Sequence, residues 1–402
     1  MTFNLTINLT INADEEKKMG VPASNEHIPS LRRVGETVYV GLQLPLSSAG
    51  GTDIAEQTDQ VFRSLVARLE EAGGTMADLT KLHTYYLFAG DGADVTAYWE
   101  RMTAVRLRHL ANPGPAATAL RVHGVGHGQA LIAVDGIAEL CRDKQRIMPE
   151  HAWDWSIPTP FSQGWRVGEK IYVGGQISAD RQGRTIAPGS AVAQTKNTLE
   201  YIEHVLHDAQ VNWANVCALK IAYKHGGDAE ASRQLGASIV AEVARRFPAQ
   251  RPVITVIGVD LLYEGLLLEI DAVASRDVGL PVRPEYAASH VAPLAFSPGW
   301  LSGGELYIGA QSKSDAGQLE AQLEGALAGL AAVIRASGAS VGDLVKLNVF
   351  LLPGESTETV HRVLERFLSP GRTVVSIVQV AGFLVDGQKV QVDGVALPEQ
   401  RS

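Results

Sequence analysis

The sequence is poor in cysteine and in long apolar runs, and it carries no surplus of positive charge. Its two cysteines, Cys141 and Cys217, are too few for a disulfide framework in 402 residues, which fits a reducing compartment. No segment offers the roughly 18 consecutive apolar residues of a membrane span, and the start lacks the basic and apolar regions of a secretory signal. We therefore expect a cytoplasmic protein without a membrane partner.

The charge balance argues against nucleic acid as a partner. Lys and Arg number 35 and Asp and Glu 44, so the formal net charge of −9 repels phosphate backbones. A hydrophobic content of 46% is typical of a folded globular protein. Because the chain is longer than one ordinary core supports, we expect two or three domains.

A motif of five parts occurs three times along the chain. Its first part is a β-branched strand that ends in Gly-x-Gln, at 38–43, 171–176 and 306–311. Such a pattern predicts a strand whose glycine lets another backbone or a ligand come close. An amphipathic helix follows in each copy and ends near Gly73, Gln210 and Gly338.

The remaining parts of the motif predict a strand, a helix and a pair of strands. The strand begins at Asp78, Asn215 and Asp343, and the helices are expected at about 96–110, 228–247 and 356–368. The strand pair opens with Pro-x-x-Thr and closes with an Asp-x-Val/Ile-Ala sequence. Charged, proline-bearing stretches at 141–151 and 275–286 are typical of linkers.

This order of motifs resembles the RidA/YjgF family of imine and enamine deaminases. The resemblance implies an α+β fold of three tandem RidA-like (chorismate-mutase-like) domains, at 1–142, 143–276 and 277–402. They would form an intramolecular pseudo-trimer with a central β-barrel, outer helices and ligand clefts between neighbours. The chain would then be monomeric, and further dimerisation stays open.

In the resembled family an arginine in Pro-x-Arg-Thr holds the substrate carboxylate, and a glutamate helps to position the hydrolytic water. The arginine position holds Ala117, Ile254 and Arg372 in the three copies, and the glutamate position holds Ala133, Glu269 and Gln391. Only Arg372 offers the planar fork of donors that meets a carboxylate. We therefore expect one competent cleft with Arg372, unless this arginine is a structural partner of Asp393 or Glu365.

Glu269 alternates with apolar residues along its predicted strand and shares a face with Asp271. Two interpretations stay open. A glutamate among apolar neighbours has a raised pKa and acts as acid or base, or it forms a salt bridge with Arg251 or Arg121. The sequence does not say whether Glu269 shares a cleft with Arg372.

Three lysines, Lys81, Lys220 and Lys346, stand at similar offsets in the three copies. They invite comparison with serine–lysine amidohydrolases, but the serine-glycine-glycine segments of those enzymes are lacking on the matching strands. We interpret the lysines as structural.

The resemblance implies hydrolytic deamination, or a related C–N bond hydrolysis, of a small carboxylated imine or enamine without cofactor or metal. The expected catalytic residues are Arg372, Glu269 and Gln391, and the expected lining residues are Gly309, Ala310, Phe296, Phe161 and Thr373. One alternative is a non-catalytic binder of 2-oxo acids or a regulatory scaffold, and another is a specialised pathway hydrolase centred on Glu269. Some family members are described as ribonucleases, which the acidic charge disfavours here.

Overall fold

Three mixed β-sheets, each carrying two helices, make up the computed structural model of this protein. It describes residues 27–45, 53–90, 92–126, 128–155, 157–249, 251–285 and 296–398. The sheets share one internal order of five strands: β1-β2-β6-β3-β4 in the first, β8-β9-β12-β10-β11 in the second and β14-β15-β18-β16-β17 in the third. The expected α+β class is confirmed.

The strands are short and are separated by tight connections. The first sheet contains β1 (Leu31–Val34), β2 (Thr37–Gln43), β3 (Leu79–Tyr86), β4 (Ala116–Arg121) and β6 (Ile132–Glu139). The second contains β7 (Lys144–Ile147), β8 (Gly164–Val167), β9 (Lys170–Ile177), β10 (Val216–Lys224), β11 (Val253–Val259) and β12 (Leu268–Ser275). The third contains β13 (Leu280–Val282), β14 (Gly299–Ser302), β15 (Glu305–Gln311), β16 (Leu344–Leu351), β17 (Val374–Gln379), β18 (Val390–Ala396) and the short β5 (Gly124–Val125).

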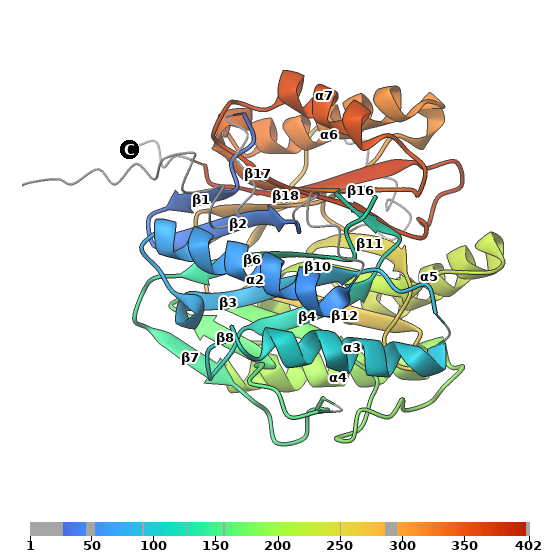
Figure 1. The fold of residues 1–402 in the computed structure, drawn as a ribbon. Helices are drawn as coiled ribbons and strands as arrows, with labels where there is room; N and C mark the ends of the chain where they lie inside the picture. The colour runs from blue at the N-terminus through green and yellow to red at the C-terminus, as the bar shows by residue number, and fades with distance from the viewer. Residues whose placement is uncertain are drawn as a thin grey trace, which may run out of the picture.

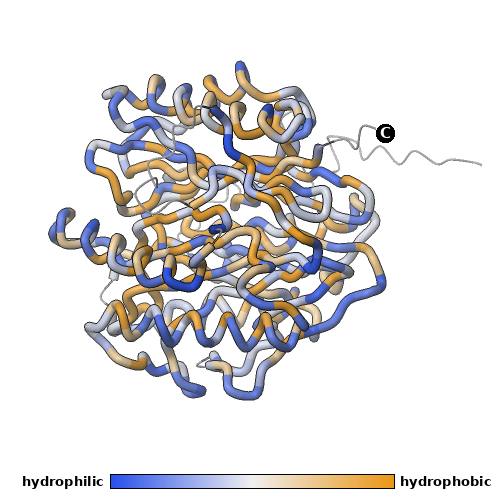
Figure 2. Tube along the Cα trace, turned by 180° about the vertical axis from the view of Figure 1, so that it is seen from behind, coloured by the Kyte–Doolittle hydropathy of each residue, from blue (hydrophilic) through white to orange (hydrophobic). Residues whose placement is uncertain are grey.

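Two helices cover the outer face of each sheet. They are α2 (Ile54–Glu71) and α3 (Gly92–Arg106) on the first, α4 (Ala191–Asp208) and α5 (Ala229–Ala244) on the second, and α6 (Leu319–Ala336) and α7 (Thr357–Phe367) on the third. Figure 1 shows these helices on the outside of the molecule and the strands within it. Apolar side chains of each helix pair and its sheet form one core, and Figure 2 shows the hydrophobic segments gathered in the interior.

The first helix of each pair ends at a residue with left-handed backbone. Gly73 and Gly338 have φ of 81° and 84°, which glycine adopts without steric cost. Gln210 occupies the matching place after α4 with φ of 62°. The predicted ends of all three helices are therefore confirmed, and the glutamine carries a strain that the two glycines avoid.

The expected central barrel is wrong. The three sheets stay separate in their hydrogen bonding, and within the described residues they meet through single bridges, such as Ala116 with Ser162 and Gly258 with Gly382, and through the short pairing of β5 with β17. The inner faces carry buried lysine, aspartate and histidine side chains. These side chains lie between the sheets, and the described backbones of neighbouring units are joined by short contacts, such as Ser297 N–H to the Pro252 carbonyl at 3.1 Å, and not by a continuous ladder.

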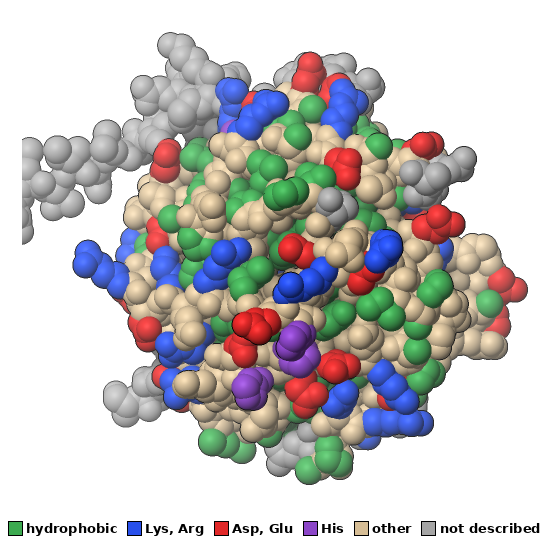
Figure 3. Space-filling view, turned by 90° about the horizontal axis from the view of Figure 1, so that it is seen from below, with side chains coloured by type: hydrophobic (Ala, Val, Ile, Leu, Met, Phe, Trp, Pro, Cys, Tyr) green, Lys and Arg blue, Asp and Glu red, His purple; other side chains and the backbone are tan. Residues whose placement is uncertain are grey.

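The segments expected to be linkers contain strands. β7 lies within 141–151 and β13 within 275–286, and each extends the edge of its sheet by pairing with β8 or β14. On the face seen in Figure 3, acidic and basic side chains are interspersed and do not gather into a patch of one sign. No helix in the described part of the chain is long and apolar enough to cross a bilayer.

Candidate active site

The Gly-x-Gln glycines lie where one sheet meets the next. A Cβ on Gly174 of β9 would lie 3.1 Å from the carbonyl oxygen of Ala117 in β4, and a Cβ on Gly309 of β15 would lie 3.1 Å from that of Ile254 in β11. Gly41 of β2 stands in the same way against Val375 of β17. The prediction that these glycines admit another backbone is confirmed. We call the three contacts the first interface (β4 with β9), the second (β11 with β15) and the third (β17 with β2).

Glu269 lies at the first interface. Its β12 position is matched by Ala133 of β6 and Gln391 of β18, so the other two interfaces lack a carboxylate there. The side chain accepts a hydrogen bond from the backbone of Ala119 in β4. A Cβ on Gly175 would lie 1.8 Å from Glu269 Oε1, so the carboxyl group needs a glycine beside it.

Burial raises the pKa of Glu269 to about 8, and the neighbouring carboxylate of Asp271 adds to the shift. The ammonium group of Lys81 and the Ala119 hydrogen bond act in the opposite direction without reversing it. Glu269 is therefore largely protonated at neutral pH. The salt bridge considered above is absent, because Arg121 pairs with Asp260 at 2.9 Å and Arg251 lies over the Phe296 ring.

Glu269 faces a small cavity with aromatic walls. The cavity has a volume of about 30 Å³, enough for one or two water molecules. Its walls come from α3, β4, β9, the segment between β7 and β8 and the connection between β11 and β12, namely Trp99, Ala119, Ile177, Trp153, Trp155, Leu262, Tyr263 and Leu266. A buried carboxyl group thus faces a water-sized space that is otherwise largely apolar.

Two glutamines hold Trp153 over this cavity. Trp153 Nε1 donates to Gln176 Oε1 at 3.2 Å, and Gln163 Nε2 donates to the Trp153 carbonyl at 2.8 Å. Gln176 Nε2 also donates to Gln163 Oε1 at 2.7 Å, which joins β9 to the residue directly before β8. The rings of Trp153 and Trp155 lie 4.8 Å apart, so fixing the first tryptophan also fixes the second.

An arginine without a carboxylate partner among the described residues ends α3, and Phe161 and Trp155 lie between it and this cavity. Arg106 is 1% exposed, and its Nε and Nη2 have no hydrogen-bond partner within the described residues. Its guanidinium carbon lies 4.7 Å from the centre of the Phe161 ring, which packs against Trp155. Burial lowers the pKa of Arg106 to about 9. Tyr86 Oη and Trp99 Nε1 are likewise buried without a described partner, so unused donors gather on this side of the interface.

The second interface collects most of the predicted lining residues. Gly309 and Ala310 belong to β15, and Phe296 stacks edge-on against Phe247 with ring centres 6.3 Å apart. Gln391 Nε2 donates to the Val256 carbonyl at 2.9 Å, so the amide joins the two sheets. Phe161 lies instead at the first interface, against Arg106.

Arg372 lies apart from Glu269 and Gln391. It is exposed and lines a surface hollow with Ser340, Asp343 and Ser369. The register places Val375 opposite Leu347, as Ala117 stands opposite Leu82. The position matched to the family arginine is therefore Val375. Thr373 precedes β17 and donates to the Leu344 carbonyl at 2.8 Å.

One of the three lysines does not match the other two. Lys220 lies opposite Asp271 and Thr255. The residues that match Asp271 in the other two sheets, Asp135 and Asp393, lie opposite His83 and Asn348 instead of a lysine. Lys81 and Lys346 are matched in register by Ala218. Sequence offsets alone had aligned the second strand two residues out of step.

Sequence reasoning missed Arg106, Gly175 and the two tryptophans of the cavity. One signal was available: Gly175 follows Gly174, where the matching positions hold Leu42 and Ala310. A second glycine next to a strand glutamate indicates that the carboxyl needs room. Nothing in the helical pattern of α3 distinguishes Arg106 from an exposed arginine.

The comparisons with known proteins concern mainly the middle of the chain. Residues 156–276 match the endoribonuclease L-PSP family. This segment includes β9, α4, β10, α5, β11 and β12, and hence Glu269. A RidA-like domain is thus supported for the segment that carries the glutamate.

Relatives of this family agree with the match. The 3-aminoacrylate deaminase RutC of Acinetobacter baylyi is 29% identical over 115 residues, which are 29% of this chain and 86% of the relative. A RutC family protein of Pyrococcus abyssi is 26% identical over 118 residues, 29% of this chain and 87% of its own. A solved chorismatase structure covers 79% of this chain and 93% of its own, with a TM-score of 0.53 and 16% identity, a likeness of fold.

Proposed function

We propose that this protein is a hydrolase of the imine and enamine deaminase kind, acting at the first interface with Glu269 as its acid–base group. The observation that carries the proposal is a buried, largely protonated carboxyl group facing a water-sized cavity. It lies in the segment that matches the endoribonuclease L-PSP family, and a protein similar to part of this chain is named a 3-aminoacrylate deaminase.

The chemistry needs one proton donor and one water molecule. An imine carbon is electrophilic, so water adds to it once the nitrogen receives a proton. Protonated Glu269 gives that proton and, as the carboxylate, accepts one from the attacking water. Glu269 then gives its proton to the nitrogen of the resulting carbinolamine and accepts the hydroxyl proton, the carbon–nitrogen bond breaks, ammonia leaves and a carbonyl group remains. The apolar walls limit competing solvation of the reacting groups.

Arg106 supports a substrate that carries a carboxylate. Its guanidinium is buried, and two of its nitrogens lack partners among the described residues. A carboxylate satisfies both donors and removes the cost of an unpaired buried cation. Because the cavity holds only one or two waters, substrate entry requires displacement of the partly exposed Trp155.

We further propose that each sheet with its two helices is one RidA-like unit, with bounds 1–142, 143–276 and 277–402. Their common strand order and their similar glycine contacts support this division. The three units would form an intramolecular pseudo-trimer in which the first interface holds the chemistry. The second and third interfaces lack the glutamate, so they would be structural.

The direct test is ammonia release from an enzymatically generated 2-imino acid and from 3-aminoacrylate. Glu269→Gln should reduce kcat at least about 100-fold, because general acid–base catalysis contributes on that order. Gly175→Ala should give a comparable loss, since the new methyl group displaces the carboxyl. The matched control Ala310→Gly, at the second interface, should retain activity.

Arg372→Ala separates this proposal from a site built around Arg372. With Glu269 as the acid–base group, Arg372→Ala keeps wild-type turnover. Loss of turnover in Arg372→Ala and its survival in Glu269→Gln would overturn the assignment. Binding of a 2-oxo acid without any turnover would favour a binding protein instead.

A further inference from the structure

Three equivalent positions on the inner faces of the sheets hold two lysines and one alanine. The registers place Lys81 opposite Ile137, Lys346 opposite Val395 and Ala218 opposite Val273. The two lysines are buried. They show that this position in the fold accommodates a buried ammonium group. The second sheet has Ala218 there and therefore has no such group at this position.

Each of the two lysines contacts a hydroxyl group of its own sheet and an aspartate of a neighbouring sheet, the second sheet for Lys81 and the first for Lys346. Lys81 Nζ donates to Thr118 Oγ1 at 3.2 Å and to the Val173 carbonyl at 2.7 Å, and lies 3.5 Å from Asp271 Oδ2. Lys346 Nζ donates to Ser376 Oγ at 3.3 Å and lies 3.1 Å from Asp135 Oδ2. The ammonium groups thus occupy similar cradles of oxygen atoms.

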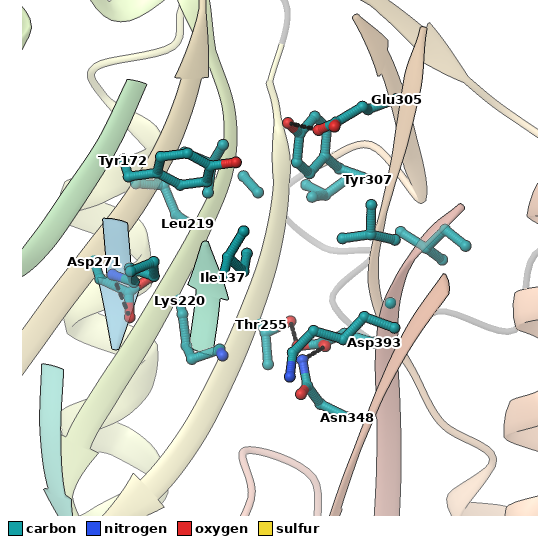
Figure 4. A pocket seen from close by; sticks show the side chains of 18 of the residues that line it. Ile137, Tyr172, Leu219, Lys220, Thr255, Asp271, Glu305, Tyr307, Asn348 and Asp393 are labelled. Carbon is teal, nitrogen blue, oxygen red and sulfur yellow. Dashed lines mark hydrogen bonds and ion pairs between the residues drawn. The ribbon is translucent and has the colours of Figure 1, made fainter. Parts of the chain in front are cut away.

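The third cradle has the oxygens and an open space where the ammonium would be. Thr255 Oγ1 donates to Asp393 Oδ2 at 2.6 Å, and Asn348 Nδ2 donates to Asp393 Oδ1 at 2.5 Å, so both groups bonded to this carboxylate are uncharged. A cavity of about 100 Å³ is lined by these residues, by Ala218 and by Ile308, the match of Val173. Lys81, Lys220 and Lys346 line the same cavity. Figure 4 shows Thr255, Asn348 and Asp393 at one end and Tyr172, Glu305 and Tyr307 at the other.

Lys220 does not take the place of the missing lysine. Its ammonium lies 5.7 Å from the centre of the Phe350 ring. Phe350 pairs with Gln391 on β18, whereas Lys346, the match of Ala218, pairs with Val395, and Asp393 lies between these two positions on the strand. His83 bridges Asp135 and Asp271, at 2.8 and 3.4 Å. Lys220 lines the same cavity, and the carboxylates of Asp393, Asp271 and Asp135 raise its pKa against the effect of its burial.

The described carboxylates around the cavity outnumber its ammonium groups by one, and the excess lies at the tyrosine end, while the charges at the Asp393 end balance. Two carboxylates at the tyrosine end, Glu139 and Glu305, share the single ammonium of Lys170 at 3.1 and 2.6 Å. At the other end three aspartates face three lysines. Within the described residues this network contains five carboxylates, four ammonium groups and the His83 imidazole, namely Asp135, Glu139, Asp271, Glu305 and Asp393 with Lys81, Lys170, Lys220, Lys346 and His83.

We propose that this cavity binds a primary ammonium group, supplied by the ammonium ion or a short alkylamine. The N–H donors would meet Thr255 Oγ1, Asp393 Oδ2 and the Ile308 carbonyl, as Lys81 Nζ meets their counterparts. The alkyl chain would lie along Ala218 and Val253, where a lysine stem would run. This site is separate from the Glu269 cavity and does not depend on the proposed hydrolase activity.

The test is thermal unfolding of the full chain in ammonium, ethylammonium, potassium and tetramethylammonium chloride at equal ionic strength. A ligand that binds only the folded state raises Tm in a saturable way, and we expect about 2 °C or more with ethylammonium. Tetramethylammonium, which has no N–H donor, should give no such rise. An equal rise with tetramethylammonium, or a larger one with potassium, would overturn the proposal.

Two variants at Ala218 test whether ethylammonium raises Tm by binding at this position. A variant at Lys346 tests whether removal of a buried lysine creates a second such site. Ala218→Lys supplies the missing group and Ala218→Met fills the space without charge, so both should lose the ethylammonium response. Lys346→Ala opens a second cradle and should enlarge that response. If Ala218→Lys does not fold, the other two variants still decide. A full response in Ala218→Met would place the amine elsewhere and end the proposal.

Discussion

At the scale of single residues, the buried Glu269 carboxyl lowers folding stability near neutral pH, and the same group is the proposed acid–base catalyst. Its raised pKa means that folding favours the protonated carboxyl over the carboxylate. In the unfolded chain a glutamate ionises near pH 4.3, so the folded state binds more protons between about pH 4.3 and 8. Folding stability therefore falls as the pH rises through this window. A group retained at such a cost is a candidate for function.

The first prediction concerns the pH dependence of Glu269. If the protonated carboxyl is the acid, kcat/KM should fall above about pH 8, where Glu269 loses its proton. Glu269→Gln should raise Tm more at pH 8 than at pH 5, because the amide does not ionise. Steady-state kinetics and calorimetry at both pH values measure the two effects. A Tm gain that is the same at pH 5 and pH 8 would contradict the raised pKa.

The second prediction concerns Arg106. Arg106→Met keeps much of the side-chain volume and removes a buried cation without a described carboxylate partner, so the variant should unfold at a higher temperature. The same change should weaken binding of a 2-oxo acid at least about 10-fold, followed by the fluorescence of Trp99, Trp153 and Trp155. Arg121→Met is the matched control, since Arg121 already pairs with Asp260. It should lose stability and keep the binding.

At the scale of elements, the ends of the first helices show one backbone geometry realised by different residues. Gly73, Gln210 and Gly338 all take positive φ after α2, α4 and α6. The geometry comes from the helix termination and the strand that follows, and the residue type only changes its cost. The conformation at Gln210 is therefore imposed by its surroundings.

The third prediction follows from this strain. Gln210→Gly should stabilise the protein by about 1 kcal/mol, because left-handed backbone costs a residue with a Cβ roughly that amount. Gly338→Ala should destabilise it by a similar amount. Urea unfolding of the two variants measures both changes. If Gln210→Gly lowers stability, the side chain of Gln210 contributes more than its backbone costs.

At the scale of the whole molecule, the buried charges on the inner faces tie the three sheets together. Asp135 of the first sheet accepts a hydrogen bond from Ser376 at 2.5 Å and pairs with Lys346, both in the third sheet. Thr118 and Lys81 of the first sheet contact Asp271 of the second. Each aspartate thus serves two sheets, and the sheets are expected to unfold together.

The fourth prediction tests this coupling with Asp135→Asn. The change leaves buried Lys346 without its carboxylate and should cost about 3–5 kcal/mol. Lys346 and His83 hold the pKa of Asp135 far below its usual range despite its burial. Its contribution is therefore complete above about pH 4 and is lost as the pH falls below that value. The difference between wild type and variant should shrink in acid. Glu320→Gln, on an exposed ion pair that solvent screens, should change stability far less than Asp135→Asn.

Local patterns predicted most of the elements and their order, but missed β7 and β13, which lie in segments expected to be linkers. Period-2 and period-3.6 patterns located the strands and helices, and the repeated motif predicted the shared arrangement of the three sheets. Of the two interpretations of Glu269, the structure agrees with a buried carboxyl of raised pKa, on the face that alternation along the strand shares with Asp271.

Only the tertiary structure decided the registers, the contacts between sheets and the space within them. A shift of two residues keeps every side chain on its face, so the apolar pattern could not distinguish Lys220 from Ala218 as the match of Lys81. The strand that follows Arg372, β17, is apolar at most positions, so its sequence pattern could not predict the register. The sequence therefore matched Arg372, and not Val375, to the family arginine. The partners of Arg106, the open cradle at Ala218 and the separation of the sheets depend on which side chains meet across interfaces. Those meetings join residues more than a hundred positions apart, and no local pattern records them.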